Sequence, residues 1–138
     1  MTDAGVVSAR LNRIEACVRE LRELLVPAEV HTDIRARRFA EHTLQIAIQA
    51  AQDVASHIVS ARRLGEPSTN AELFRLLSED GWLPAAMVPT LRAMIGFRNV
   101  VVHGYDTVDL AILEAAASDG LADLDAFVTA VRARMLTG

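Results

Sequence analysis

The 138-residue chain has no lysine, one cysteine and few aromatic residues. All its basic residues are arginines, which reflects either coding bias or guanidinium groups that bind phosphate, and composition does not separate the two. Because Cys17 has no partner in the chain, an internal disulfide is excluded and a reducing compartment is expected. Cys17 lies in a helical pattern beside Val18 and Leu21, so we expect a small buried side chain rather than a reactive thiol. Aromatic residues make up 4% of the chain and hydrophobic residues 51%, so the core must be aliphatic, which favours packed helices over a β-sandwich. The net charge of -4 excludes a global basic field for binding nucleic acid.

Targeting and membrane signals are missing as well. The N-terminal stretch MTDAGVVSARLNRIEA has neither the basic start nor the apolar run of a signal peptide. Charged residues interrupt every apolar segment before an uncharged run reaches membrane-spanning length. We therefore expect a cytoplasmic protein with no membrane partner. The length is that of one domain, residues 1–138, which can bury its own core.

Helical periodicity dominates the first half of the chain. Apolar residues three and four apart predict a first helix that starts near Val6 and stops at Pro27. A second helix is expected over residues 31–64, where no proline or glycine interrupts the pattern. No segment of the chain alternates polar and apolar residues over a useful length. The fold is therefore predicted to be an all-α bundle of five or six helices.

Capping signals divide the second half into shorter helices. Thr69 followed by Glu72 indicates a capping box for a short helix that ends at the sequence EDG. Pro84 is expected at the first position of the next helix. Asp106 or Thr107 would cap a last segment, which is interrupted at residues 118–120.

The stretch RNVVVHGY, residues 98–105, departs from this pattern of leucine, alanine and arginine. Arg98 and His103 are five residues apart, about 140° on a continuous helix. They can serve one small site only if the helix ends between them or a second subunit contributes. Gly104 favours a helix end here, because glycine adopts backbone conformations that other residues avoid. A cation, a group that titrates near neutral pH and the phenol of Tyr105 would then share one exposed corner.

These groups suit cleavage of a phosphodiester in RNA. The ribose 2′-hydroxyl must lose a proton and the leaving oxygen must gain one, and a histidine side chain can perform either transfer. An arginine side chain can neutralise two phosphate oxygens through paired hydrogen bonds. One chain supplies one such histidine, whereas a symmetric pair of chains supplies one base and one acid.

The full string is more specific than its charged residues alone. RN, three branched aliphatic residues, H, one residue and Y resembles the R-x4-H-x-Y motif of HEPN-superfamily proteins of the HepT type, the toxins of HEPN/MNT toxin–antitoxin pairs. The stretches AIQAAQDVASHIV, ELFRLLSEDGWLP and LADLDAFVTAVRARM also resemble helices of that family.

The resemblance implies a HEPN-type helical bundle and a metal-independent ribonuclease that acts as a homodimer, with both motifs meeting in a cleft at the interface. Arg98 and His103 would be catalytic, giving a 2′,3′-cyclic phosphate, and transfer RNA or messenger RNA would be the substrate. An MNT-type nucleotidyltransferase antitoxin would attach AMP to Tyr105, using ATP, to silence the enzyme. No resident cofactor is implied.

Other polar residues carry weaker signals. Asn99 would bond backbone or orient a motif side chain. Asp53 and His57, four apart on one helix face, would form a local ion pair or support the site, and no spacing nominates further ligands for a metal. Trp82 is expected to cover the core. Two arginine clusters form either a solvated face or contacts to RNA phosphates: Arg35, Arg37 and Arg38, and Arg62 and Arg63.

Two alternatives stay open. The chain could be a non-catalytic HEPN partner that presents Tyr105 or a helical surface to a nucleotidyltransferase. It could also be a plain helical interaction domain in which the motif is accidental, and then Arg98 and His103 should point away from each other and from any dimer cleft.

Overall fold

The computed structural model describes residues 3–103 and 108–137, and within these ranges the chain forms six α-helices and no strand. The predicted all-α fold is therefore confirmed. The helices are α1 (Ala4–Leu24), α2 (Ile34–Ala61), α3 (Glu72–Glu79), α4 (Val88–His103), α5 (Leu110–Ala116) and α6 (Asp119–Leu136). Two short 3₁₀ helices, η1 (Pro27–His31) and η2 (Ala85–Met87), precede α2 and α4.

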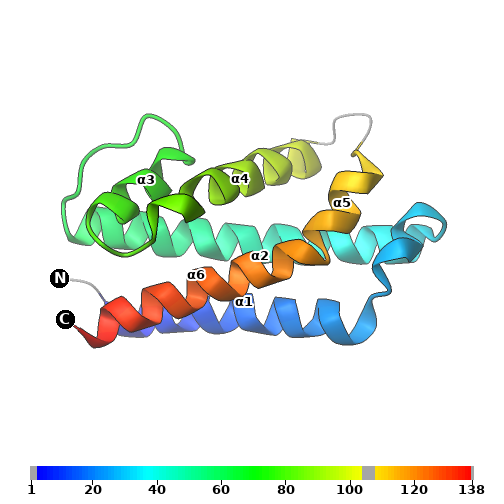
Figure 1. Ribbon diagram of the computed structural model, residues 1–138, viewed down its shortest axis with the longest axis horizontal. Coiled ribbons are helices and arrows are strands. Elements are labelled where there is room, and N and C mark those ends of the chain that lie inside the picture. Colours follow the sequence, from blue (N-terminus) through cyan, green and yellow to red (C-terminus); the bar gives the residue numbers. More distant parts are fainter. Residues whose placement is uncertain (1–2, 104–107, 138) are drawn as a thin grey trace.

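The bundle is built around α2, which contacts α1, α3, α4 and α5 (Figure 1). Helices α1 and α2 form the most extensive contact, and α6 packs along α1. Helices α3 and α4 lie on another side of α2, and α5 lies against η1 at the end opposite the two termini (Figure 1). Helix α4 is thus held by α2 and α3, and much of its surface is left uncovered.

Side-chain caps explain where three helices begin. Asp3, Asp33 and Asp109 each accept hydrogen bonds from backbone N–H groups of the first turn of α1, α2 and α5. Because Asp33 caps α2, this helix begins at Ile34, and the segment before it forms η1, which the apolar pattern did not predict. Asp109 caps α5, whereas the predicted caps Asp106 and Thr107 lie outside the described residues.

Two predicted helix starts are wrong. Thr69 is not the cap of α3: the helix begins at Glu72 without a side-chain cap, and the Thr69 carbonyl accepts a turn hydrogen bond from the Glu72 N–H. Pro84 does not occupy the first helical position, because its extended backbone precedes η2, which leads into α4. Both errors arise where one turn of tighter structure separates the signal from the helix.

The ends of α2 and α3 share one backbone motif but differ in sequence. At α3, Gly81 has φ +85°, its N–H bonds the Ser78 carbonyl, and the N–H of Trp82 bonds the Leu77 carbonyl. At α2, Arg63 and Leu64 make the same two bonds, to Ser60 and Val59, but Arg63 has φ +53°. The left-handed backbone costs a residue with a Cβ atom about 1–2 kcal/mol.

The core is aliphatic, as predicted, with one aromatic pair at its centre. Phe74 and Phe127 are fully buried and meet edge to face, with ring centroids 6.0 Å apart. Cys17 is buried, and burial raises the pKa of its thiol, which fits the predicted structural role. Trp82 is buried at the edge of the core, also as predicted.

Candidate functional site

Helix α4 carries the motif, and it runs unbroken through Arg98 and His103. The helix therefore does not end between the two residues, which was one of the two conditions for a shared site. Within one chain the two positions remain about 140° apart around the helix axis. The other condition, a contribution from a second subunit, is the one that stays open. Gly104 and Tyr105 lie outside the described residues.

Arg98 lies on the buried side of α4. It follows the buried residues Leu91 and Ile95 by seven and three positions, and its Nε is buried with no hydrogen-bond partner among the described residues. Its Nη1 donates to the Oδ1 of exposed Asn99 at 3.4 Å. The stem of Arg98 is thus packed in the bundle while its head lies beside Asn99, where a phosphate could accept from the unpaired donors.

Asp53 does not pair with His57, although the two residues are four apart on α2. The Asp53 carboxylate lies 3.8 Å from the Nε of Arg10 and accepts a 2.8 Å hydrogen bond from Gln49 Nε2. The Nε2 of His57 instead accepts from the backbone N–H of Asp3. Both side chains therefore connect α2 to α1, and the predicted local ion pair is wrong. Asp53 is nine residues from Leu44, which lines a pocket beside α4, so Asp53 lies on the opposite side of α2 from that pocket.

Most of the predicted RNA-binding arginines have partners inside the chain. Arg62 Nε donates to Asp80 at 2.7 Å, Arg38 Nη1 donates to Glu41 at 2.8 Å, and Arg37 Nε donates to the Val30 carbonyl. Arg35 and Arg63 are exposed, and neither forms an ion pair with another described residue. Contacts to RNA at these five positions stay a prediction, and Arg63 is the one whose setting is unusual.

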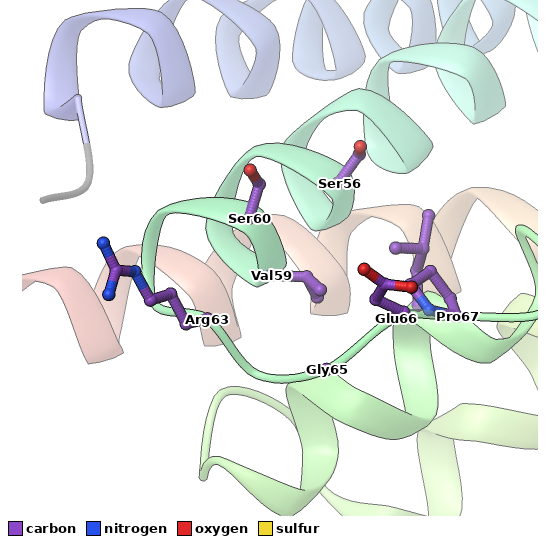
Figure 2. A pocket seen from close by; sticks show the side chains of 8 residues that line it. Ser56, Val59, Ser60, Arg63, Gly65, Glu66 and Pro67 are labelled. Atoms are coloured by element: carbon purple, nitrogen blue, oxygen red, sulfur yellow. The ribbon is translucent and has the colours of Figure 1, made fainter.

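Arg63 lines a pocket of about 450 Å³ between the end of α2 and the loop that follows (Figure 2). Ser56 and Ser60 lie on one side of α2 in this region, and Arg63 extends away from Glu66 (Figure 2). A second pocket, of about 270 Å³, is apolar and lies on the side of α4 that faces α5 and α6. Met94 and Phe97 of α4 line it together with Leu124 of α6.

Among residues 3–103 and 108–137, no group of three or more histidine, cysteine, aspartate or glutamate side chains is arranged to hold a metal ion. By length and composition alone, the helical stretch Ala85–Val102 is apolar enough to cross a membrane, although it contains Arg92 and Arg98. Only 11% of this stretch is buried in the molecule. The helix that carries the motif is therefore also an unusually exposed apolar helix.

Comparison with known proteins finds similarity along most of the chain. A family model described as ribonuclease HepT-like matches residues 14–131. The mRNA nuclease HepT of Shewanella oneidensis is 23% identical over 129 residues, which cover 93% of this chain and 97% of that protein. The tRNA nuclease HepT of Aphanizomenon flos-aquae is 31% identical over 97 residues, which cover 70% of this chain and 66% of that protein. The predicted resemblance is confirmed.

Solved structures support the fold. The HEPN toxin of Shewanella oneidensis, tri-AMPylated and in complex with an MNT antitoxin, superposes with a TM-score of 0.86 at 24% identity, covering 96% of this chain and 99% of that one. YutE of Bacillus subtilis, a cytosolic protein of unknown function, superposes with a TM-score of 0.87 at 14% identity, covering 99% and 92%. The predicted HEPN-type bundle is confirmed.

Proposed function

Since this chain belongs to the ribonuclease HepT-like family, we propose that it is a metal-independent RNA endonuclease, the toxin of a HEPN/MNT pair in the cytoplasm. The observation that carries the proposal is the family match, which includes α4 with Arg98 and His103 at the motif spacing. The two HepT relatives are named as an mRNA nuclease and a tRNA nuclease, so RNA is the expected substrate class.

The chemistry uses two copies of the motif on one scissile phosphate. One His103 side chain takes the proton of the 2′-hydroxyl as its oxygen attacks phosphorus, and the other gives a proton to the departing 5′-oxygen. The P–O5′ bond breaks as the P–O2′ bond forms, so the product is a 2′,3′-cyclic phosphate and a free 5′-hydroxyl. Arg98 stabilises the extra negative charge at phosphorus, and Asn99 orients the Arg98 head.

The composite site requires a homodimer, and the outer face of α4 supports one. Pro89, Ala93, Gly96 and Val100 recur three and four positions apart, so they share this face. A Cβ atom added at Gly96 would meet nothing within 4 Å, which leaves room for a close partner. An exposed apolar helix face fits a protein contact. Insertion into a bilayer fits less well, because the two arginines of the stretch would be costly there.

Cleavage of RNA by the purified chain tests the proposal. Wild type should cut RNA in excess chelator, and Arg98→Ala and His103→Ala should each slow cleavage about 100-fold or more. Arg13→Gln, at an exposed position on α1, is the matched control and should cut at the wild-type rate. Mass spectrometry of the products should find the cyclic phosphate.

Wild type that leaves RNA as intact as His103→Ala does would contradict the enzyme proposal. If Tyr105 were nevertheless modified by the antitoxin, the chain would be a non-catalytic HEPN partner. Expression in cells gives a second reading, because growth arrest that His103→Ala relieves is expected only of the enzyme.

A further inference from the structure

Arg92 is a cation on the motif helix that the motif does not explain. It is exposed, it makes no hydrogen bond or ion pair with any other described residue, and α4 contains no acidic residue. Asn99 and His103 follow it by seven and eleven positions, which places each of them within about 20° of Arg92 around the helix. Arg92 therefore shares a helix face with the Asn99 and His103 positions of the motif, about 16 Å along the axis from His103, whereas Arg98 lies about 120° away.

This face borders the edge of the bundle between α2 and α4, on the side away from α6. Thr90, Met94 and Phe97 line the apolar pocket toward α5 and α6, so Arg92 lies on the opposite side of α4. On α2, Ile48 lines that same pocket, and Gln52 and Ser56 are turned from it by about 40° and 80° around the helix. The two residues therefore lie progressively farther from the pocket, toward the α2–α4 edge.

An unpartnered polar atom lies on α2 at this edge. Gln52 is partly exposed, and its Oε1 is buried without a hydrogen-bond partner among the described residues. The Arg98 Nε, buried in the same way, is the other such atom in those ranges. Because Arg98 lies on the buried side of α4, Gln52 Oε1 is the atom that marks this edge as a place where another molecule can supply a hydrogen-bonding group.

The edge continues into the Arg63 pocket, because Ser56 lines that pocket together with Ser60 and Arg63 (Figure 2). Arg63 holds a left-handed backbone, φ +53°, at the position where the same motif at the end of α3 has Gly81. An arginine at a position that favours glycine, with its side chain exposed, points to a role for the guanidinium. Glu66 also lines the pocket and opposes that charge.

We propose that a single strand of RNA lies along the α2–α4 edge, with its scissile phosphate at the motif and flanking phosphates on Arg92 and Arg63. The inference rests on the proposed ribonuclease function and adds where the substrate lies. Neutral amide and hydroxyl groups between the two arginines suit contacts to ribose and bases without strict sequence choice. The arginines supply the local positive charge that a chain of net charge -4 otherwise lacks.

Binding of an uncleavable RNA tests the inference separately from catalysis. The probe is a fluorescent single strand of about twelve nucleotides with 2′-O-methyl riboses, titrated against the full chain at several salt concentrations. Arg92→Gln and Arg63→Gly should each weaken binding and reduce the slope of log affinity against log salt by about 0.7. Glu66→Gln should tighten binding, and Arg13→Gln, the matched control, should bind like wild type.

Arg63→Gly excludes a trivial loss of fold, because glycine relieves the left-handed backbone and the variant should melt at a higher temperature than wild type. Weaker binding by a more stable protein would therefore come from the lost charge. If Arg92→Gln and Arg63→Gly had the affinity and salt slope of Arg13→Gln, the inference would be overturned. The ribonuclease proposal would still stand in that case if His103→Ala abolished cleavage.

Discussion

At the scale of single residues, Asp80 organises the corner where α2, α3 and α6 meet. Its carboxylate accepts from Arg62 Nε at 2.7 Å and from the indole Nε1 of Trp82 at 3.0 Å. The guanidinium groups of Arg62 and Arg134 lie 5.8 Å and 5.0 Å from the centre of the Trp82 ring. The Arg62 hydrogen bond, helped by that of Trp82, lowers the pKa of Asp80.

We expect Asp80→Asn to lower the free energy of unfolding by about 1 kcal/mol at pH 7. Because the folded pKa of Asp80 lies below its unfolded value, the charge stabilises the fold above the unfolded pKa of about 3.9. That contribution is lost as the pH falls through the folded pKa. Urea unfolding of wild type and Asp80→Asn, measured at pH 7 and at successively lower pH, should therefore show a shrinking difference in their free energies of unfolding.

Glu23→Gln, at an exposed position near the end of α1, is the control for removing one acidic charge. It should leave the unfolding free energy nearly unchanged at pH 7. A difference between wild type and Asp80→Asn that stayed constant to the lowest pH would mean that the charge of Asp80 is not what stabilises this corner.

At the scale of an element, α4 has two unlike faces. Leu91 and Ile95 are buried against the bundle, and Arg98 continues the same face. The outer face is small and apolar around Gly96, and Arg92 and Asn99 border it. One helix therefore anchors the site in the core and supplies the surface that a second copy would cover.

We predict that Gly96→Leu abolishes dimer formation, because leucine would fill the space that the partner helix needs. The substitution should not unfold the chain, since leucine is a better helix former than glycine by about 1 kcal/mol. Sedimentation velocity should find a 15.0 kDa monomer, and RNA cleavage should fall with it. Ala126→Leu, at an exposed position on α6, is the control and should stay dimeric. A dimeric, active Gly96→Leu protein would rule out this interface.

At the scale of the whole molecule, the proposed ribonuclease is an acidic protein that would have to bind a polyanion. The net charge of -4 repels RNA at a distance, so the arginines of the α2–α4 edge and of the motif have to supply attraction locally. A bulky anion added beside the motif would compete with substrate through both charge and volume. This gives a physical reason for silencing such an enzyme by attaching AMP.

We therefore expect an MNT-type nucleotidyltransferase antitoxin, supplied with ATP, to attach AMP to Tyr105 and to abolish RNA cleavage. Mass spectrometry of the peptide that contains Tyr105 measures the modification. Tyr105→Phe should take up no AMP and should still cut RNA in the presence of antitoxin and ATP. If this variant were silenced as well as wild type, the antitoxin would act by binding alone.

Local sequence was enough to predict the helices, because apolar residues at helical spacing pack only if the chain is helical there. It also predicted Trp82 and Cys17 as core residues, and the motif made Arg98 and His103 the candidate site residues. It failed where short range signals compete: Asp33 rather than the apolar pattern starts α2, and Asp109 rather than an earlier residue caps α5. Arg92 has no distinctive neighbours in the sequence, so only its place on the folded helix makes it a candidate.

Packing between helices settled the rest. Whether Asp53 meets His57 or Arg10 depends on which face of α2 lies against α1, and two faces of one helix look alike until the neighbours are in place. The burial of the Arg98 stem, the open side of α4 and the shared edge with α2 likewise follow from long-range contacts. Periodicity along a chain determines that a helix has a buried face, but only its packing partners determine what each remaining face can bind.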